Sequence, residues 1–217
     1  MNELILSELK NQYTLTERDM GKYHILKKNG MKFIITAYRI EKLGFVSFIE
    51  MRAMLGLMKM ESFILTAAEK DLPLFSGDFI NAMGRCTLII EFYDTMIAPL
   101  PPDAVENFRS VKAKFGGLPP YEPGPRWYDS IRYDFSFGAV DKSMKARQDE
   151  ITGEYLKAYT GCVTTAPDVD PVVKKAATRK YVDGLFANGG PAVDQFKKLF
   201  GEPAAREIFG QYLFSVD

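Results

Sequence analysis

Two long apolar runs separated by an acidic segment constrain this 217-residue chain more than any other feature. The runs are LMKMESFILTA (57 to 67) and RCTLIIEFYDTM (85 to 96), and their β-branched and aromatic content is typical of strands. Between them, DLPLFSGDF (71 to 79) carries Asp71 and Asp78. Its proline and glycine predict a loop, so the sequence places two acids between buried strands.

The first half of the chain predicts a series of antiparallel strands. They cover residues 22 to 28, 31 to 41, 44 to 55, 57 to 67 and 85 to 96. The first two flank Asn29-Gly30, a dipeptide that favours a tight hairpin turn because it tolerates positive φ. Short connections between the first four strands predict a meander. The fifth strand is apolar on both faces and therefore needs a covering layer on each side.

The second half of the chain predicts helices. They are expected at residues 103 to 115, 141 to 160, 171 to 187, 191 to 200 and 203 to 213, in addition to a short helix at 2 to 11. A long loop (116 to 130), rich in proline and glycine, precedes a predicted strand at 131 to 138. Strands first and helices later predict one α+β domain over residues 1–217, a three-layer α/β/α sandwich with a central antiparallel sheet.

Charge and cysteine content narrow the class of protein. Lys plus Arg and Asp plus Glu both number 28, so no general attraction to nucleic acid or to an anionic membrane is expected, although a local basic pocket is compatible with this balance. Cys86 and Cys162 stand outside any CxxC pair, which predicts reduced thiols and a cytoplasmic location. No apolar run approaches the roughly 18 residues of a membrane span, so we expect a soluble protein with no membrane partner.

Most standard catalytic motifs are missing. The chain has no Walker A loop, no GxGxxG motif after a strand, no HExxH and no GxSxG. Its single histidine, His24, leaves little material for a histidine metal site or a Ser/His/Asp triad. We therefore expect no bound metal and no classical hydrolase chemistry.

The remaining chemical candidates are carboxylates on apolar strands. They are Glu50, Glu61, Asp78 and Glu91. Strand alternation puts Glu61 on the same face as Phe63 and Leu65, which predicts a covered layer rather than solvent. Burial raises the pKa of a carboxyl group and keeps it protonated near neutrality, so such a group can act as a general acid.

A structural interpretation of these acids stands beside the catalytic one. Glu50 would then pair with Arg52 or Arg39, and Glu61 with Lys59, at a solvated sheet edge. Asp71 would cap its own turn through a side-chain hydrogen bond. The sequence offers no comparable local role for Asp78.

The long loop and the methionines suggest a ligand site. Arg126 and Arg132 flank Trp127 and Tyr128, and guanidinium groups bind ligand carboxylates bidentately; solvated arginines are the alternative. The clustered methionines Met51, Met54, Met58 and Met60 suit either a soft surface around a flat apolar ligand or simple core filling.

The order and spacing of several motifs resemble the ferredoxin-dependent bilin reductases. These motifs are Tyr38-Arg39, Glu50, Glu61, the D-x-P-x-x-x-x-D pattern of DLPLFSGD, Pro125-x-Trp127, Tyr181 and the closing segment FKKLFGEPAAREIFGQYLF. The resemblance touches nearly the whole chain. It rests on the order of the motifs rather than on any one of them.

This resemblance implies an oxidoreductase that binds a linear tetrapyrrole such as biliverdin between the sheet and the C-terminal helices. Electrons would arrive singly from reduced ferredoxin, through radical intermediates, with no bound flavin or nicotinamide. Protein carboxylates would supply the protons. Asp78 falls on the central proton-donating aspartate of the family, Glu50 falls near its strand glutamate, and Glu61 stands where some members carry a histidine.

One departure from the family leaves alternatives open. The place of a second catalytic aspartate reads Asn188-Gly189-Gly190, with Asn188 as a candidate substrate-binding residue beside Arg126 and Arg132. Two non-enzymatic interpretations therefore stand beside the reductase. One is a non-catalytic protein that binds a tetrapyrrole (haem or bilin) or another flat hydrophobic molecule. The other is a pocket filled by methionine and phenylalanine side chains.

Overall fold

A single antiparallel sheet organises the computed structural model, which describes all residues 1–217. Its strands are β1 (Leu15–Glu17), β2 (Ile25–Lys28), β3 (Met31–Ile40), β4 (Gly44–Ala53), β5 (Met58–Ala67), β6 (Leu74–Ala82), β7 (Arg85–Tyr93) and β8 (Phe137–Val140). The spatial order is β1-β3-β4-β5-β6-β7-β8, and β2 pairs with the other end of β3. From β3 to β7 each strand pairs with the next one along the chain, so the predicted meander is confirmed.

The predicted acidic loop is largely a strand. Strand β6 occupies Leu74–Ala82, and the turn that follows it is Met83-Gly84. A loop spanning the whole interval between the two apolar runs would have been unusually long for a compact meander. Gly77 lies within this strand rather than in a turn. A side chain would not fit there, because a Cβ atom would meet the Phe63 ring and stand 2.9 Å from Ile90.

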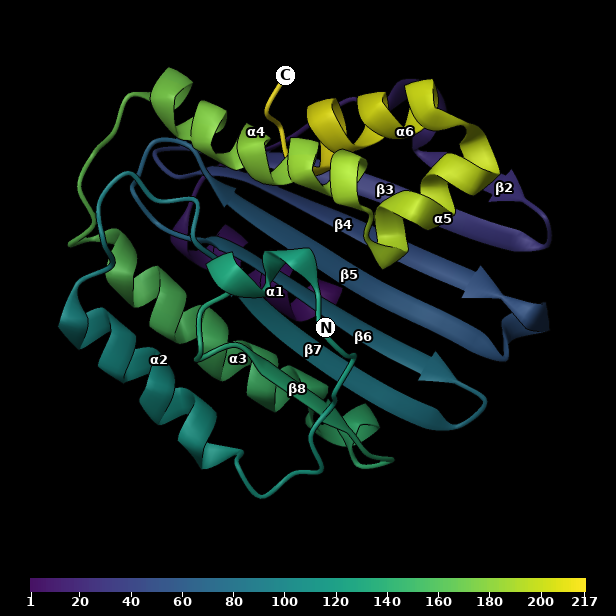
Figure 1. Cartoon of the computed structure of the whole chain (residues 1–217), viewed down its shortest axis with the longest axis horizontal. Coiled ribbons are helices and arrows are strands. Elements are labelled where there is room, and N and C mark those ends of the chain that lie inside the picture. Colours follow the sequence, from purple (N-terminus) through teal and green to yellow (C-terminus); the bar gives the residue numbers. More distant parts are fainter.

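Helices cover both faces of the sheet, as Figure 1 shows. They are α1 (Asn2–Gln12), α2 (Pro102–Lys114), α3 (Met144–Val163), α4 (Pro171–Asn188), α5 (Pro191–Phe200) and α6 (Glu202–Glu207). Short 3-10 helices form at η1 (Gly21–Tyr23), η2 (Met54–Gly56) and η3 (Trp127–Ile131), and a π-helix at η4 (Ile208–Leu213). The predicted α+β sandwich of three layers is confirmed.

The sequence analysis did not predict the short strand β1, and most element boundaries differ from the prediction by a few residues. Two differences are larger. The helix expected over 203 to 213 is α-helical only to Glu207, after which the chain widens into the π-helix η4. The strand expected over 131 to 138 begins only at Phe137, because the residues before it finish η3 and a loop.

Each face of the sheet has its own hydrophobic core. Helices α1, α2 and α3 pack on one face around stacked aromatic rings, with the Phe75 and Phe92 centroids 4.5 Å apart. Helices α4, α5 and α6 pack on the other face, where Tyr181 and Phe196 are buried. The two cysteines are buried free thiols, as predicted. None of the helices is both long and apolar enough to cross a bilayer.

Asp71 does not cap its own turn as the structural interpretation predicted. Its buried carboxylate accepts hydrogen bonds from the backbone N–H groups of Ile97 and Ala98 and lies 2.9 Å from the buried Lys174 ammonium. Lys174 also donates to the Thr95 carbonyl at 2.7 Å. The loop before β6 is therefore tied to the segment after β7 and to helix α4.

Candidate functional site

A cavity of about 850 Å³ lies between the sheet and the layer that contains α4, α5 and η4. Most of its lining side chains are apolar. The central strands supply its floor through alternate residues, which are Met60, Ser62 and Ile64 of β5, Ser76, Asp78 and Ile80 of β6, and Ile89, Glu91 and Tyr93 of β7. This volume is within the range of ligand-binding pockets, so the cavity can hold a sizeable flat apolar molecule.

Strand register brings the polar groups of the floor together. Asp78 pairs with Ser62 of β5 and with Ile89 of β7, and Ser76 pairs with Glu91. Directly paired residues point to the same face of a sheet, as do residues two apart along a strand. Asp78 and Glu91 are therefore diagonal neighbours on the cavity floor.

Asp78 has the properties of a proton donor. The Ser62 hydroxyl donates a hydrogen bond to Asp78 Oδ1. Burial raises the pKa of Asp78 to about 6, against the opposing effect of the Ser62 hydrogen bond, and the Glu91 carboxylate adds to the increase. A carboxyl group with this pKa is partly protonated near neutrality and can donate a proton into the cavity.

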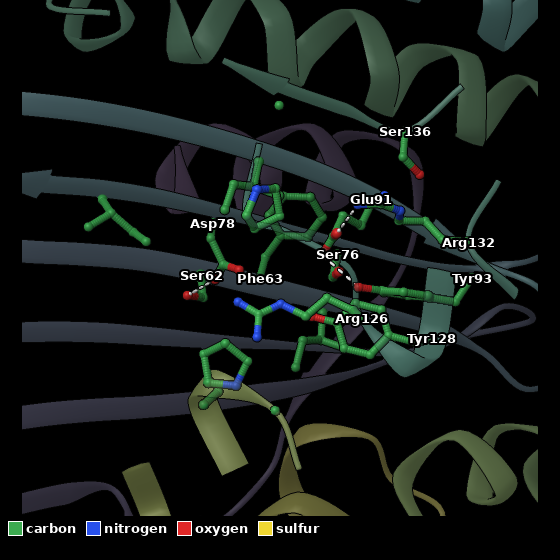
Figure 2. A pocket seen from close by; sticks show the side chains of 18 of the residues that line it. Ser62, Phe63, Ser76, Asp78, Glu91, Tyr93, Arg126, Tyr128, Arg132 and Ser136 are labelled. Carbon is green, nitrogen blue, oxygen red and sulfur yellow. Dashed lines mark hydrogen bonds and ion pairs between the residues drawn. The ribbon is translucent and has the colours of Figure 1, made fainter. Parts of the chain in front are cut away.

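Glu91 is held in a network beside Asp78 (Figure 2). Tyr93 donates its hydroxyl to Glu91 Oε2 at 2.6 Å, and Arg132 Nη1 lies 3.2 Å from Glu91 Oε1. Arg132 Nη2 also lies 3.0 Å from Asp129 Oδ1. These contacts hold the Glu91 carboxylate on the floor of the cavity and leave Arg132 committed to two protein carboxylates.

Arg126 is in a different situation from Arg132. It lines the cavity (Figure 2), its guanidinium forms no ion pair, and its buried Nε atom has no hydrogen-bond partner. Buried polar groups are nearly always hydrogen-bonded. An unpartnered guanidinium nitrogen at a cavity wall is therefore suited to a ligand that brings its own acceptor, such as a carboxylate.

An aromatic wall closes one end of the cavity. Tyr93 of β7 stacks on Tyr181 of α4 with ring centroids 4.6 Å apart, and Tyr128 packs edge-on against Tyr93. Trp127 donates its indole N–H to the Gly189 carbonyl at 2.8 Å. This bond attaches the long loop to the junction between α4 and α5.

The structure does not bring Glu50 and Glu61 together with Asp78. They are paired with each other across β4 and β5 and point to the opposite face of the sheet. Glu61 Oε2 lies 3.0 Å from the Met1 amino group, and Glu50 forms no ion pair. The alternative partners for these glutamates, Lys59, Arg52 and Arg39, do not pair with them either. Because side chains alternate along a strand, Ser62 rather than Glu61 faces Asp78.

Asn188 also lies outside the cavity. Its exposed side chain donates to the Gly184 carbonyl within helix α4 at 3.2 Å. At this junction the cavity is lined instead by Gly190 and Pro191. No group of three or more His, Cys, Asp or Glu side chains is placed to hold a metal ion.

The site contains residues that the sequence predictions did not assign to it. Ser62 and Tyr93 are the most important of them. Glu91 was among the candidate carboxylates, but the sequence did not place it beside Asp78. Strand alternation puts Glu91 on the same face of β7 as Ile89 and Tyr93. Only the pairing of Asp78 with Ile89 shows that this is also the face of Asp78. Without strand β6 the register between Asp78 and its neighbours could not be derived.

The fold and the cavity together define an α/β/α sandwich with a ligand-sized pocket between the sheet and the C-terminal helices. No protein-family model matches the chain, and no curated protein matches it in sequence. Among solved structures, it is similar to phytochromobilin synthase from tomato in complex with biliverdin, with a TM-score of 0.80 and 15% sequence identity. The match covers 99% of this chain and 82% of that chain. At this identity the similarity shows a shared fold.

Proposed function

We propose that this protein binds a linear tetrapyrrole such as biliverdin in the cavity and reduces it with electrons that a ferredoxin delivers one at a time. The biliverdin-bound neighbour of the same fold supports the choice of ligand. The volume and apolar lining of the cavity suit a flat tetrapyrrole. No flavin or nicotinamide is part of this proposal.

The observation that carries the proposal is the acid on the cavity floor. Reduction of one double bond adds two electrons and two protons to the ligand. Asp78, with its pKa raised to about 6, supplies a proton to the ligand after an electron arrives. Ser62 orients the carboxyl group, and Glu91 helps to keep it protonated.

A single acid is sufficient when electrons arrive separately. Asp78 donates one proton, recovers a proton from solvent, and donates again after the second electron. This sequence accounts for a site in which residues 188–190 contribute no carboxylate. Glu91 is a poor second donor because it is already paired with Arg132.

Arg126 anchors the ligand in this proposal. Its unpartnered guanidinium meets a propionate carboxylate of the tetrapyrrole and orients the ring system over Asp78. Arg132 acts indirectly by holding Glu91. Glu50 and Glu61 have no role in proton transfer, since both point away from the cavity.

A non-catalytic tetrapyrrole carrier is the second candidate. The specific observation in its favour is the junction between α4 and α5, where Asn188 is exposed and no acid reaches the cavity. Such a protein would use the same pocket and the same Arg126 contact. It would bind the ligand without changing its oxidation state.

Absorption spectroscopy with biliverdin separates the two candidates. We expect the wild-type protein and Asp78→Asn both to shift the biliverdin band on binding. After a reduced ferredoxin system is added, the wild type should convert the biliverdin spectrum to that of a reduced product. Asp78→Asn should do so at least about a hundredfold more slowly, because a general acid usually contributes a factor of this size or more.

Glu61→Gln is the matched control for this experiment, because its side chain lies on the other face of the sheet. It should bind and turn over biliverdin at close to the wild-type rate. Equal turnover by Asp78→Asn and wild type would exclude the proposed proton donor. Binding with no ferredoxin-driven change would select the carrier.

A further inference from the structure

Three hairpin turns lie together at one end of the sheet, on the right of Figure 1. They are the β2–β3 turn at Asn29-Gly30, the β4–β5 turn that contains η2, and the β6–β7 turn at Met83-Gly84. The backbone N–H of Met83 donates to the Leu57 carbonyl at 3.0 Å. The second and third turns are therefore in direct contact.

Large apolar side chains project into solvent from these two turns. Leu55 is fully exposed, and Met83, Leu57 and Met54 are 74%, 61% and 53% exposed. Met54, Leu55 and Met83 have φ values of 53°, 53° and 50°, a left-handed conformation that is uncommon for residues of this size. Glycine or asparagine would suit both the backbone and the solvent better, so the apolar side chains need another explanation.

A row of basic side chains crosses the sheet beside the apolar tips. Lys27 pairs with Lys32, Lys32 with Arg52, and Arg52 with Lys59, on four neighbouring strands. Like charges directly opposite each other destabilise a sheet. None of these four side chains forms an ion pair within the protein, so the row is a concentrated positive surface.

Strands β2 to β7 carry no acidic residue at this end of the sheet, and Asp141, whose backbone N–H donates to the Cys86 carbonyl at 3.0 Å, is the acid at the β7–β8 edge. Residues 25–34, 51–60 and 79–87 contain no Asp or Glu, and they add Lys28 and Arg85 to the basic row. The nearest carboxylates on the same face are Glu50 and Glu61, one row further in, and Glu61 is already bound to the Met1 amino group. The net charge of zero does not cancel this local excess, because salt screens charges beyond about 8 Å.

We infer that this end of the molecule docks on an anionic membrane surface, in contrast to the absence of a membrane partner expected from the overall composition. Leu55, Leu57 and Met83 insert at the headgroup level, and the basic row contacts the lipid headgroups. Charge complementarity supports an anionic partner. Side chains that protrude singly from turns favour a lipid surface over a folded protein, since lipid accommodates them without preformed pockets.

The same end of the sheet carries the methionine-lined part of the cavity. Met31, Met51 and Met58 line the cavity close to the three turns. Docking in this orientation places that part of the cavity near the lipid. The inference rests on the turns and the basic row, and it does not require the proposed reductase activity.

Vesicle sedimentation with the full chain tests this inference. Wild-type protein should sediment with phosphatidylcholine vesicles that contain about one quarter phosphatidylglycerol, and much less with pure phosphatidylcholine. Lys32→Gln/Arg52→Gln/Lys59→Gln should weaken binding about a hundredfold, since each basic residue contributes about fivefold near an anionic surface. Leu55→Ser/Leu57→Ser/Met83→Ser should weaken it at least tenfold through lost apolar insertion.

Matched controls change the same residue types elsewhere on the surface. Val172→Ser/Val173→Ser replaces exposed apolar residues of α4, and Lys157→Gln/Lys180→Gln replaces exposed lysines of α3 and α4. Both controls should bind vesicles like the wild type, and circular dichroism should show all variants folded.

Three results would overturn the inference. The first is absence of wild-type binding to the anionic vesicles, and the second is equal binding by the test variants and the controls. The third is a wild-type dimer that the Leu55/Leu57/Met83 variant loses without any vesicle binding, which would identify a second copy of the chain as the occupant.

Discussion

Asp78 combines a chemical capability with a local instability. Its pKa is raised to about 6 in the folded protein, above the value of about 3.9 expected in the unfolded chain. The folded state therefore binds this proton more tightly than the unfolded state does. The contribution of Asp78 to stability is most favourable below pH about 4, decreases as the pH rises from about 4 to about 6, and stays low above that range.

We predict that Asp78→Asn stabilises the protein at pH about 8, by about 3 kcal/mol, because it removes a carboxylate whose ionisation is unfavourable in the cavity. The same variant should have a much smaller effect at pH about 4, where the wild-type group is protonated in the folded state and about half protonated in the unfolded state. Urea unfolding at the two pH values measures the difference. An equal effect at both would contradict the assigned pKa.

Glu91 acts on the same proton from the next strand. Its negative charge is one of the causes of the raised pKa of Asp78. We predict that Glu91→Gln lowers the pKa of Asp78, both by removing this charge and by releasing Arg132 from its ion pair. The alkaline limit of turnover should move to lower pH, and an NMR titration of the Asp78 carboxyl carbon should show the same shift.

Glu122→Gln is the control for this prediction, since Glu122 is exposed and does not line the cavity. Its pH profile should match the wild type. If Glu91→Gln and Glu122→Gln behave alike, Glu91 has no influence on the proton donor.

At the scale of the elements, the long loop depends on one contact with helix α4. Trp127 at the start of η3 packs over Gly184, where a Cβ atom would meet the six-membered part of the indole ring and stand 2.7 Å from its Cζ3 atom. The indole N–H also bonds to the Gly189 carbonyl. Helix α4 therefore positions the segment that carries Arg126 and Tyr128.

We predict that Gly184→Ala displaces Trp127, destabilises the protein by about 1 to 3 kcal/mol through overpacking, and weakens biliverdin binding. Gly161→Ala in helix α3 is the matched control, because nothing lies within 4 Å of the position that the added methyl group would occupy. That change should be neutral or stabilising by up to about 1 kcal/mol. Thermal unfolding and a biliverdin titration check both, and equal behaviour of the two variants would exclude the contact as the cause.

For the whole molecule, the buried pair of Asp71 and Lys174 joins segments that are distant in the chain. Burial raises the pKa of Asp71, but hydrogen bonds from Ile97, Ala98 and Lys174 outweigh it and hold the pKa below the usual value. The carboxylate therefore stabilises the fold at neutral pH. This contribution is lost as the pH falls through the lowered pKa.

We predict that Lys174→Met destabilises the protein by about 3 to 5 kcal/mol, because it leaves the Asp71 charge buried without its partner. Asp71→Asn/Lys174→Met should be less destabilised than Lys174→Met alone, since the double variant buries no unpaired charge. Denaturant unfolding at neutral pH measures both. A double variant as unstable as the sum of the single changes would show that the pair is not coupled.

Much of the fold was predictable because its signals are local. Apolar runs, the Asn29-Gly30 turn and proline or glycine breaks identified most strands and helices, and the order of elements predicted three layers. Strand β6 was missed because Pro73 and Gly77 are typical of a loop and Asp78 has low strand propensity. That sequence is explained by tertiary contacts, since Gly77 makes room for Phe63 and Asp78 faces the cavity.

The sequence by itself determined that a two-sided antiparallel sheet lies between helical layers and that Asp78 is a candidate proton donor. Only the tertiary structure decided which acids meet. The side-chain period of a strand is two, so a one-residue difference in register separates Ser62, which faces Asp78, from Glu61 on the opposite face. Register depends on turns and packing across the whole sheet, whereas propensity is read within a few residues.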